Sequence, residues 1–235
     1  MSDKPKIMTV YGTRPEAIKV APVVSALQDD DRFDSVVVST GQHKEMLEQV
    51  NKRFGITPDH DMALMKPGQT LNELVARAIQ GLDPIIEEEK PDVIISQGDT
   101  STAMVAALAG FHKGVKVVHL EAGLRTGNIF SPFPEEANRK IIGQITSLHL
   151  APTNESRENL RRENFRSKDI VVTGNTVIDA LLAASEWDVQ FDDPRLEELR
   201  SSDEKLVLVT THRRENLDAM KEIGGAVQDL SLIHI

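Results

Sequence analysis

The sequence predicts an α/β protein built on a doubly wound, mainly parallel β-sheet. Short runs rich in Val and Ile alternate with segments of helical periodicity, the order of elements that produces a parallel sheet. Two of these runs, 92–96 and 115–120, are followed by a polar residue and a nearby glycine, Gln97 with Gly98 and Glu121 with Gly123. The carboxyl ends of parallel strands meet at one edge of the sheet, where ligands of such folds bind. We therefore expect the functional residues at that edge.

Runs with strand character recur at intervals along the first 172 residues. The expected strands are 6–11, 34–40, 92–96, 115–120, 147–151 and 169–172. Helical periodicity fills most of the intervals between them. The expected helices begin near 14 and then span 44–54, 71–90, 100–112, 134–144, 154–163 and 176–187. This alternation favours the doubly wound fold.

Three features interrupt the pattern. Pro22 and Pro84 fall inside predicted helices, where proline removes a hydrogen bond, so we expect a kink or restart at the first and a break at the second. Residues 55–69 are polar and punctuated by Gly and Pro, which predicts a long loop near the functional edge. Loops of that length are often functional.

The chain divides at an acidic segment. We expect a Rossmann-like first domain over residues 1–182 and a linker over 183–204, where Asp and Glu accumulate. Residues 205–235 begin with an apolar strand at 206–211 and continue with a helix at 216–230. One strand and one helix cannot bury their own apolar faces. This part therefore predicts the start of a second α/β domain that is truncated.

Composition sets limits on partners and location. The 235 residues include 27 Lys and Arg against 37 Asp and Glu, a net charge of −10, which gives no overall attraction to nucleic acid or to an anionic membrane. There is no cysteine, hence no disulfide and no cysteine zinc site. No run of about 18 apolar residues predicts a membrane span. We expect a cytoplasmic protein without nucleic-acid or membrane partners.

Three carboxylates are expected to converge at the carboxyl edge of the sheet. Asp99 and Glu121 follow two predicted strands, and Glu135 follows two prolines at the start of a helix. Asp99 alone is explained as the N-cap of the next helix, and Glu135 with Glu136 as acidic residues at the positive end of a helix dipole. Glu121 has no such explanation, because a loop that closes a buried strand has no packing need for a carboxylate. Together the three indicate a site.

Basic residues at two strand-to-helix turns indicate anion binding. Arg14 and Lys19 lie near the N-terminus of the first helix, which attracts anions; the alternative is solvated surface charge. His212 and the two arginines after it follow the last predicted strand in the same way. Two such strand ends on two α/β units suggest a ligand clamped between domains. The dinucleotide and P-loop glycine patterns are absent, which argues against NAD and ATP.

Histidines elsewhere favour no metal site. His112, His119 and Glu121 are the candidate ligands, but the sequence lacks both cysteines and a His-x-x-x-His helix. His119 is expected to face the core or a crevice instead. Gln42 and His43, in the loop after the second strand, are better candidates for ligand contacts, although a histidine in a turn is often merely exposed.

Six short segments stand out in the sequence, and five of them contain residues singled out above. They are Gly-Thr-Arg-Pro-Glu-Ala-Ile-Lys at 12–19, Gln-Gly-Asp-Thr at 97–100, Glu-Ala-Gly-Leu-Arg-Thr-Gly at 121–127, Pro-Glu-Glu-Ala-Asn-Arg at 134–139, Thr-Gly-Asn-Thr-Val-Ile-Asp at 173–179 and His-Arg-Arg-Glu at 212–215. In this order they resemble the non-hydrolysing UDP-N-acetylglucosamine 2-epimerases, over about residues 6–230. The resemblance implies two Rossmann-like domains of the glycosyltransferase-B type with the active site between them, and a homodimer.

The resemblance also implies a function. Members of this family interconvert UDP-N-acetylglucosamine and UDP-N-acetylmannosamine at C2 for cell-surface polysaccharide synthesis. Motif by motif, it implies catalytic roles for Asp99, Glu121, Glu135 and His212, substrate-binding roles for Arg14, Lys19 and Arg139, and a second, activating UDP-N-acetylglucosamine near Gln42 and His43. We expect neither a metal nor another cofactor.

The chemistry of the reaction suits these residues. No carbonyl acidifies the C2–H bond, so inversion needs either oxidation at C3 by NAD, whose glycine pattern is absent, or elimination of UDP followed by its re-addition. Elimination needs carboxylates that move the proton and cations that stabilise the leaving diphosphate. We expect Asp99 as the base, with Glu121 and Glu135 as acid or sugar-orienting groups.

Three alternatives stay open at this point. The first is a hydrolysing epimerase, in which water attacks the glucal intermediate and UDP and free N-acetylmannosamine are released. The second is a glycosyltransferase donor domain, which explains the fold and the anion sites but not three carboxylates at strand ends. The third is a nucleotide-sugar-binding fragment without turnover.

Overall fold

The computed structural model describes residues 4–41, 44–203, 207–210 and 220–233. The chain forms two compact units, Met1–Trp187 and Asp188–Ile235. The first unit contains the sheet and is described first. Among the described residues, no helix has both the length and the apolar character needed to cross a membrane.

A parallel sheet of seven strands forms the centre of the first unit among the described residues. The strands are β1 (Lys6–Tyr11), β2 (Asp34–Ser39), β3 (His60–Asp61), β4 (Val93–Gln97), β5 (Lys116–Leu120), β6 (Leu148–Ala151) and β7 (Ile170–Val172). Their order across the sheet is β3-β2-β1-β4-β5-β6-β7, and every pairing is parallel. The order reverses between β1 and β4, which is the switch point where doubly wound folds bind ligands. The predicted fold class is confirmed.

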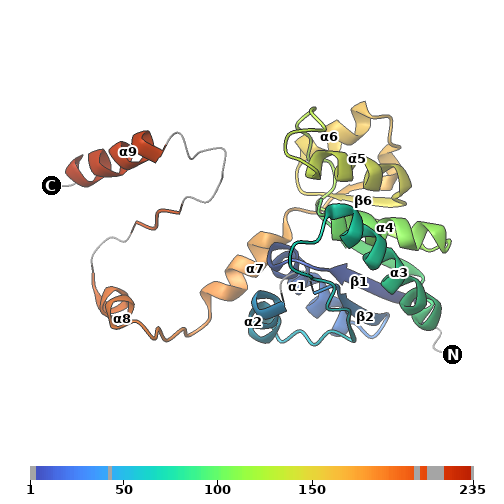
Figure 1. Ribbon diagram of the computed structural model, residues 1–235, viewed down its shortest axis with the longest axis horizontal. Coiled ribbons are helices and arrows are strands. Elements are labelled where there is room, and N and C mark those ends of the chain that lie inside the picture. Colours follow the sequence, from blue (N-terminus) through green and yellow to red (C-terminus); the bar gives the residue numbers. More distant parts are fainter. Residues whose placement is uncertain (1–3, 42–43, 204–206, 211–219, 234–235) are drawn as a thin grey trace. The chain divides into compact units, whose positions relative to one another are not determined.

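Helices cover both faces of this sheet (Figure 1). In the first unit they are α1 (Arg14–Gln28), α2 (Lys44–Phe54), α3 (Leu71–Glu89), α4 (Ser101–His112), α5 (Glu135–Ile145), α6 (Asn154–Arg162) and α7 (Thr176–Ser185), with a 3-10 turn, η1 (Ser167–Asp169). Alternate strand residues point to opposite faces: Met8 and Val10 pack under α3 and α4, whereas Tyr11 and Val37 pack under α1 and α2. The core on both faces is mainly aliphatic.

The predicted break at Pro84 is wrong, and the first helix does not restart at Pro22. Helix α1 continues through Pro22 and α3 continues through Pro84. In each helix the residues around the proline are buried against the sheet, Val24 in α1 and Leu82 and Ile86 in α3. Burial of these side chains outweighs the single backbone hydrogen bond that a proline removes.

The predicted loop over 55–69 contains a short strand. Strand β3 pairs with the end of β2, with Val38 opposite His60 and Ser39 opposite Asp61. The side chain of Asp59 stabilises the pairing of β3 with β2, because it accepts a hydrogen bond of 2.7 Å from the backbone N–H of Val37. Two residues are too few to show the alternation by which a strand is recognised in a sequence.

The second unit differs from its prediction in two places. Helix α8 (Pro194–Ser201) lies within the predicted linker, where Asp193 caps it and Pro194 opens it. Residues 207–210 form no strand, because a strand requires a partner and none of the described residues pairs with them. Helix α9 (Met220–Ile233) overlaps the predicted helix. The division into domains at 182 and 205 stays a prediction.

Gly12, which follows β1 at the switch point, has no room for a side chain. A Cβ on Gly12 would lie 2.1 Å from Oγ1 of Thr40 and 2.8 Å from Oγ1 of Thr102. We expect Gly12→Ala to lower the free energy of unfolding by about 1–3 kcal/mol, because the neighbours must move apart. Urea unfolding followed by the fluorescence of Trp187, which packs against Phe54, measures this change.

Gly143→Ala in α5 is the matched control, since its nearest neighbour would be Cζ of Phe165 at 3.4 Å, an ordinary contact. We expect it to leave stability unchanged or to raise it by up to about 1 kcal/mol through helix propensity. Equal stability of the two variants would contradict this account of Gly12.

Candidate active site

The ends of β4 and β5 bring the predicted site residues to one edge of the sheet. Gln97 and Leu120 are register partners, and the N–H of Gly98 donates to the carbonyl of Leu120 at 2.9 Å. Asp99 and Glu121 come directly after these positions. The side chain of Gln97 donates to Oε2 of Glu121 at 2.7 Å, which ties the two strand ends together.

The carboxylate of Glu121 is held by donors from three elements. Lys19 of α1 and Gln97 of β4 donate to Oε2 at 2.6 and 2.7 Å, and Asn175, at the start of α7, donates to Oε1 at 3.1 Å. The side chain of Glu121 is 11% exposed. Its φ of 66° lies in the left-handed region, where a residue with a Cβ is strained. Strain and three donors at one residue indicate a functional position.

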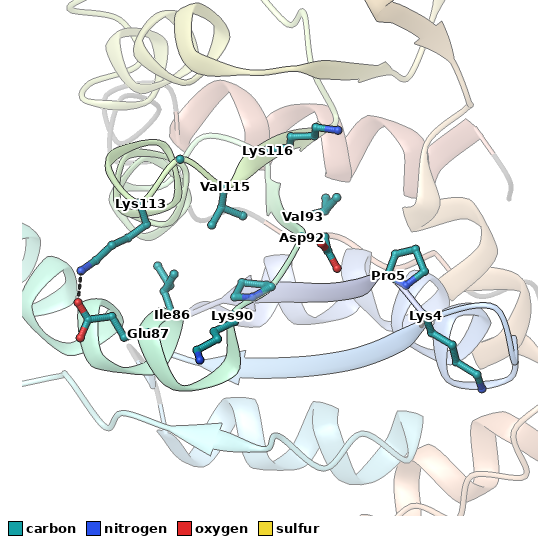
Figure 2. A pocket seen from close by; sticks show the side chains of 12 residues that line it. Lys4, Pro5, Ile86, Glu87, Lys90, Asp92, Val93, Lys113, Val115 and Lys116 are labelled. Atoms are coloured by element: carbon teal, nitrogen blue, oxygen red, sulfur yellow. Dashed lines mark hydrogen bonds and ion pairs between the residues drawn. The ribbon is translucent and has the colours of Figure 1, made fainter. Parts of the chain in front are cut away.

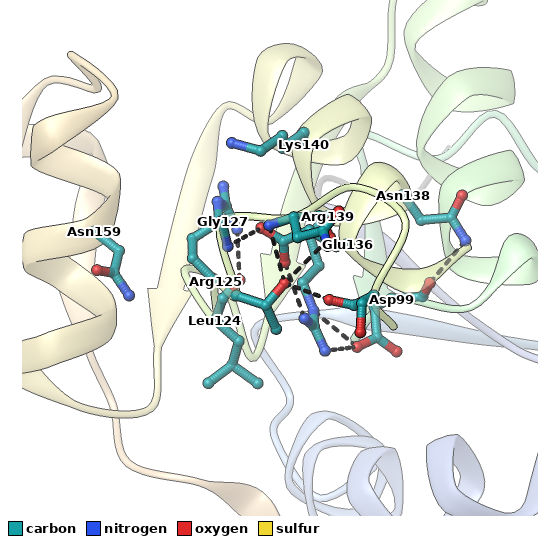
Figure 3. A network of polar contacts seen from close by, with 12 residues as sticks. Asp99, Leu124, Arg125, Gly127, Glu136, Asn138, Arg139, Lys140 and Asn159 are labelled. Atoms are coloured by element: carbon teal, nitrogen blue, oxygen red, sulfur yellow. Dashed lines mark hydrogen bonds and ion pairs between the residues drawn. The ribbon is translucent and has the colours of Figure 1, made fainter. Parts of the chain in front are cut away.

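Asp99 does not cap the next helix, so that interpretation is wrong. Thr100 caps α4 instead, because its hydroxyl accepts from the N–H of Ala103 at 3.0 Å. The carboxylate of Asp99 is therefore available, and Arg139 of α5 donates to its Oδ2 from Nε at 2.9 Å and from Nη2 at 2.5 Å (Figure 3). Oδ1 accepts no hydrogen bond from any described residue.

Helix α5 presents its first two turns to this edge. Glu136 is fully buried and accepts from Nη1 of Arg139 at 3.1 Å and from the N–H of Gly127 at 3.2 Å, so it orients the arginine (Figure 3). Glu135 is half-buried and has no hydrogen bond or ion pair with a described residue. It lies four residues before Arg139, on the same face of the helix. Its spacing therefore puts Glu135 one helical turn from the arginine that holds Asp99.

Glu16 is a site residue that the sequence analysis missed. It is buried, and its carboxylate accepts from the N–H groups of Gly12 and Thr13 at 3.0 and 2.7 Å and from the hydroxyl of Thr100 at 2.6 Å. Burial raises the pKa of this carboxyl. The signal in the sequence was the spacing of Thr13 and Glu16, which forms a capping box in α1.

Glu16 changes what the first turn can bind. The amides before a first Rossmann helix commonly bind phosphate. Here an internal carboxylate accepts from those of Gly12 and Thr13. Lys19 pairs with Glu121 and Arg14 is exposed at the helix start. The expected anion site therefore consists of side chains beside the turn, since the turn amides are already bonded.

Asn175 is a second residue that the analysis did not single out. It caps α7 by accepting from the N–H of Val177 at 3.1 Å, and its amide group is thereby directed at Glu121. An asparagine just before a predicted helix is an ordinary capping signal. Its second contact depends on how α7 packs against α1, which the local sequence does not encode.

Arg125 has a structural role beside the site. Its Nε and Nη2 donate to the two carboxylate oxygens of Glu163 at 2.9 and 2.8 Å, and Lys140 donates to the same carboxylate at 2.8 Å. These contacts lower the pKa of Glu163 to about 2. The pairs connect the loop after β5 with α5 and with the end of α6.

Two buried histidines lie side by side on β5 and β6, next to the carboxyl ends of these strands. His119 on β5 is the register partner of His149 on β6, and each is 1% exposed. Nε2 of His119 lies 2.7 Å from the carbonyl oxygen of Gly98. The expectation that His119 faces the core is confirmed. Nowhere in the part of the chain that the structure describes do three or more His, Asp or Glu side chains gather as a metal site.

A pocket of about 970 Å³ opens at the other edge of the sheet (Figure 2). It lies at the amino ends of β1, β4 and β5, so none of the predicted site residues lines it. Lys113 in its wall is paired with Glu87 at 2.5 Å and with Asp83 at 2.8 Å. We assign the chemistry to the carboxyl edge.

Three predicted site residues lie outside the described residues: Gln42, His43 and His212. Their expected roles stay predictions. The residues that the structure does bring together are Asp99 with Arg139, and Lys19 with Glu121.

Comparison with known proteins identifies the family. The sequence profile of the UDP-N-acetylglucosamine 2-epimerases matches residues 25–234. The chain belongs to this family. The enzyme of that name from Escherichia coli (strain K12) is 48% identical in an alignment of 236 positions, which covers 97% of this chain and 62% of the relative. The chain thus spans about three-fifths of the length of the curated relatives it matches.

Solved structures of 2-epimerases have the same fold. A UDP-GlcNAc 2-epimerase from Neisseria meningitidis bound to UDP-GlcNAc superposes with a TM-score of 0.85 and 42% identity, covering 96% of this chain and 62% of that one. The enzyme from Methanocaldococcus jannaschii in complex with UDP-GlcNAc and UDP gives 0.80 and 30%, covering 97% and 63%. The predicted fold class, a Rossmann-like first domain of a glycosyltransferase-B-type architecture, is confirmed.

The two buried histidines of this chain, His119 and His149, predict acid sensitivity of its folded state. Burial lowers the pKa of His119 and of His149 to about 4 from the ordinary 6.5. Between these values the unfolded chain binds protons that the folded chain does not. Their contribution to stability is therefore complete above pH 6.5 and is lost as the pH falls to 4. We expect the urea concentration at the unfolding midpoint to fall as the pH is lowered from 6.5 to 4. The fall should be less steep in His149→Asn. His112→Asn, at an exposed histidine, is the control and should behave as the parent does.

Proposed function

We propose that the full-length protein interconverts UDP-N-acetylglucosamine and UDP-N-acetylmannosamine by reversible elimination and re-addition of UDP. The reaction releases no free sugar and needs no metal or other cofactor. The family membership supports epimerisation, and the ligands bound in the related structures, UDP-GlcNAc and UDP, support a nucleotide-sugar substrate.

The geometry of Asp99 carries this proposal. Arg139 holds Oδ2 through two N–H groups, while Oδ1 accepts no hydrogen bond from a described residue and the side chain is 26% exposed. A carboxylate that is fixed on one oxygen and open on the other is suited to accept a proton from a bound sugar. We assign Asp99 as the base that removes the C2 proton.

The other two carboxylates take different roles. Both oxygens of Glu121 already accept hydrogen bonds, three in all, which suits a group that orients the sugar. Glu135 has no partner among the described residues and lies near Arg139 along α5, which suits proton transfer to C2 on the return step. Two carboxylates on different elements serve an inversion, because the proton leaves from one face of C2 and returns to the other.

The elimination is balanced within the substrate. The base takes the C2 proton, the C2–H electron pair forms the C1–C2 double bond, and the C1–O pair leaves with UDP, which gives a 2-acetamidoglucal. Lys19, Arg14 and His212 are assigned to the charge that develops on the diphosphate. The ammonium of Lys19 has three donors, so it can hold Glu121 and also contact a substrate oxygen.

The remaining assignments extend the family resemblance. They are a homodimer, a cytoplasmic location, a role in cell-surface polysaccharide synthesis, and an activating UDP-N-acetylglucosamine near Gln42 and His43. Each follows from membership in the family and from no contact described above.

Replacement of Asp99 tests the proposal. We expect Asp99→Asn, in a form of the protein that spans the full length of its relatives, to lower the rate of UDP-N-acetylmannosamine formation by at least about 100-fold, because the base is lost. Calorimetry should show UDP-N-acetylglucosamine binding within a few-fold of the parent. Chromatographic separation of the two nucleotide sugars measures the rate.

Asp83→Asn, at the opposite edge of the sheet, is the control and should keep the parental rate. Near-normal turnover by Asp99→Asn would rule out Asp99 as the base. Release of UDP and free sugar by the parent would instead favour a hydrolysing epimerase.

A further inference from the structure

The turn that carries Asp99, residues 98–100, is held by three buried side chains from three separate elements. The contacts are His119 Nε2 to the Gly98 carbonyl at 2.7 Å, Asn138 Nδ2 to the Asp99 carbonyl at 2.8 Å, and Thr100 Oγ1 to Glu16 Oε1 at 2.6 Å. His119, Asn138 and Glu16 are 1%, 4% and 2% exposed. We call residues 98–100 the Asp99 turn.

His119 must be a neutral donor in this arrangement. The carbonyl oxygen of Gly98 only accepts hydrogen bonds, so Nε2 of His119 carries the proton. Nδ1 is buried and has no hydrogen-bond partner among the described residues. An unprotonated Nδ1 fits this environment, whereas a second N–H there would be buried without an acceptor, which costs free energy. Burial also keeps the pKa of His119 near 4, so the ring stays uncharged at neutral pH.

The fold of the turn does not require these contacts. The N–H of Gly98 already bonds to the carbonyl of Leu120, and Gly98 supplies the φ of 74° that the turn needs. Thr100 caps α4. What His119 and Asn138 add is control of the two peptide groups on either side of the Cα of Asp99.

Fixing both peptide groups fixes φ and ψ of Asp99. Arg139 then fixes the side chain through its two N–H groups on Oδ2. The carboxylate is thereby left with one position, and the strength of acid–base catalysis depends on such positioning. Burying polar groups costs free energy unless each is well bonded. Several such groups at one turn therefore indicate a constraint that serves position.

We propose that His119, together with Asn138, is a positioning residue that holds Asp99 in place to take the proton from C2. This inference rests on the proposed function, in which Asp99 is the base. His119 acts through the Gly98 carbonyl and contacts neither the substrate nor the carboxylate.

His149 supplies a matched control for core packing. It occupies the register position opposite His119, is equally buried, and its ring packs 4.8 Å from that of Phe165. Among the described residues it makes no hydrogen bond to the Asp99 turn. A loss caused only by disturbing the buried histidine pair would therefore be similar for the two positions.

The experiment compares His119→Phe, His119→Gln and His149→Phe in a form of the protein that spans the full length of its relatives. Phe keeps the ring and removes the donor, whereas the amide of Gln keeps a donor near Nε2. The measurements are kcat and KM for UDP-N-acetylglucosamine, the melting temperature, and amide hydrogen exchange of residues 98–101.

We expect His119→Phe to lose about 10-fold or more in kcat with KM within about 3-fold, since misplacement by about 1 Å can cost up to about 100-fold. Amide exchange in the Asp99 turn should be faster. His119→Gln should recover most of the kcat. His149→Phe should lose melting temperature as His119→Phe does, with kcat and exchange of the turn near parental values.

Equal kcat for His119→Phe and His149→Phe would overturn the inference, as would unchanged exchange of the Asp99 turn in His119→Phe. If the parent forms no UDP-N-acetylmannosamine, the proposed function fails; faster exchange at the turn in His119→Phe alone would still support the positioning role.

If His119→Phe does not fold, Asn138→Leu, which removes the donor to the Asp99 carbonyl, replaces it. A folded Asn138→Leu variant with parental kcat, or with parental exchange where the parent is inactive, would overturn the inference.

Discussion

The two hydrogen bonds from Arg139 to a single oxygen of Asp99 are the contact on which the proposed site depends. Two N–H groups of one guanidinium on the same oxygen hold that oxygen in place and leave the other oxygen open. The arginine is itself fixed by Glu136, which is fully buried and reaches back to the N–H of Gly127. These hydrogen bonds therefore join the loop after β5, the helix α5 and the turn after β4. Asp99 is the last residue of this network, and its Oδ1 is left without a hydrogen bond from a described residue.

Glu16 gives the first turn of this Rossmann-like domain a different use. The two amides before α1, which bind phosphate in dinucleotide enzymes, bond to an internal carboxylate here. The same carboxylate accepts from Thr100, so it joins the turns on both sides of the switch between β1 and β4. In the proposed reaction, the substrate diphosphate is therefore bound by side chains. Lys19 at this edge uses one of its three donors to hold Glu121, which leaves the other two for a ligand.

Periodicity and residue type were enough to predict six of the seven strands that the structure describes, the helices that cover the sheet, and the edge that carries Asp99 and Glu121. What failed depends on contacts between distant segments. Asp99 and Thr100 are both good capping residues; Thr100 caps α4, whereas Asp99 accepts hydrogen bonds from Arg139 of the distant helix α5. Pro84 stays inside α3 because the helix is buried around it. The local sequence shows Asn175 as a cap, while its bond to Glu121 appears only when α7 packs against α1.

The most direct test of the proposed chemistry is proton NMR of UDP-N-acetylglucosamine incubated in deuterated water with a form of the protein that spans the full length of its relatives. Reversible elimination removes the C2 proton and returns a solvent deuteron. With this mechanism, UDP-N-acetylmannosamine appears with deuterium at C2 and UDP does not accumulate. Accumulation of UDP with free sugar, or a product that keeps its proton at C2, would contradict it.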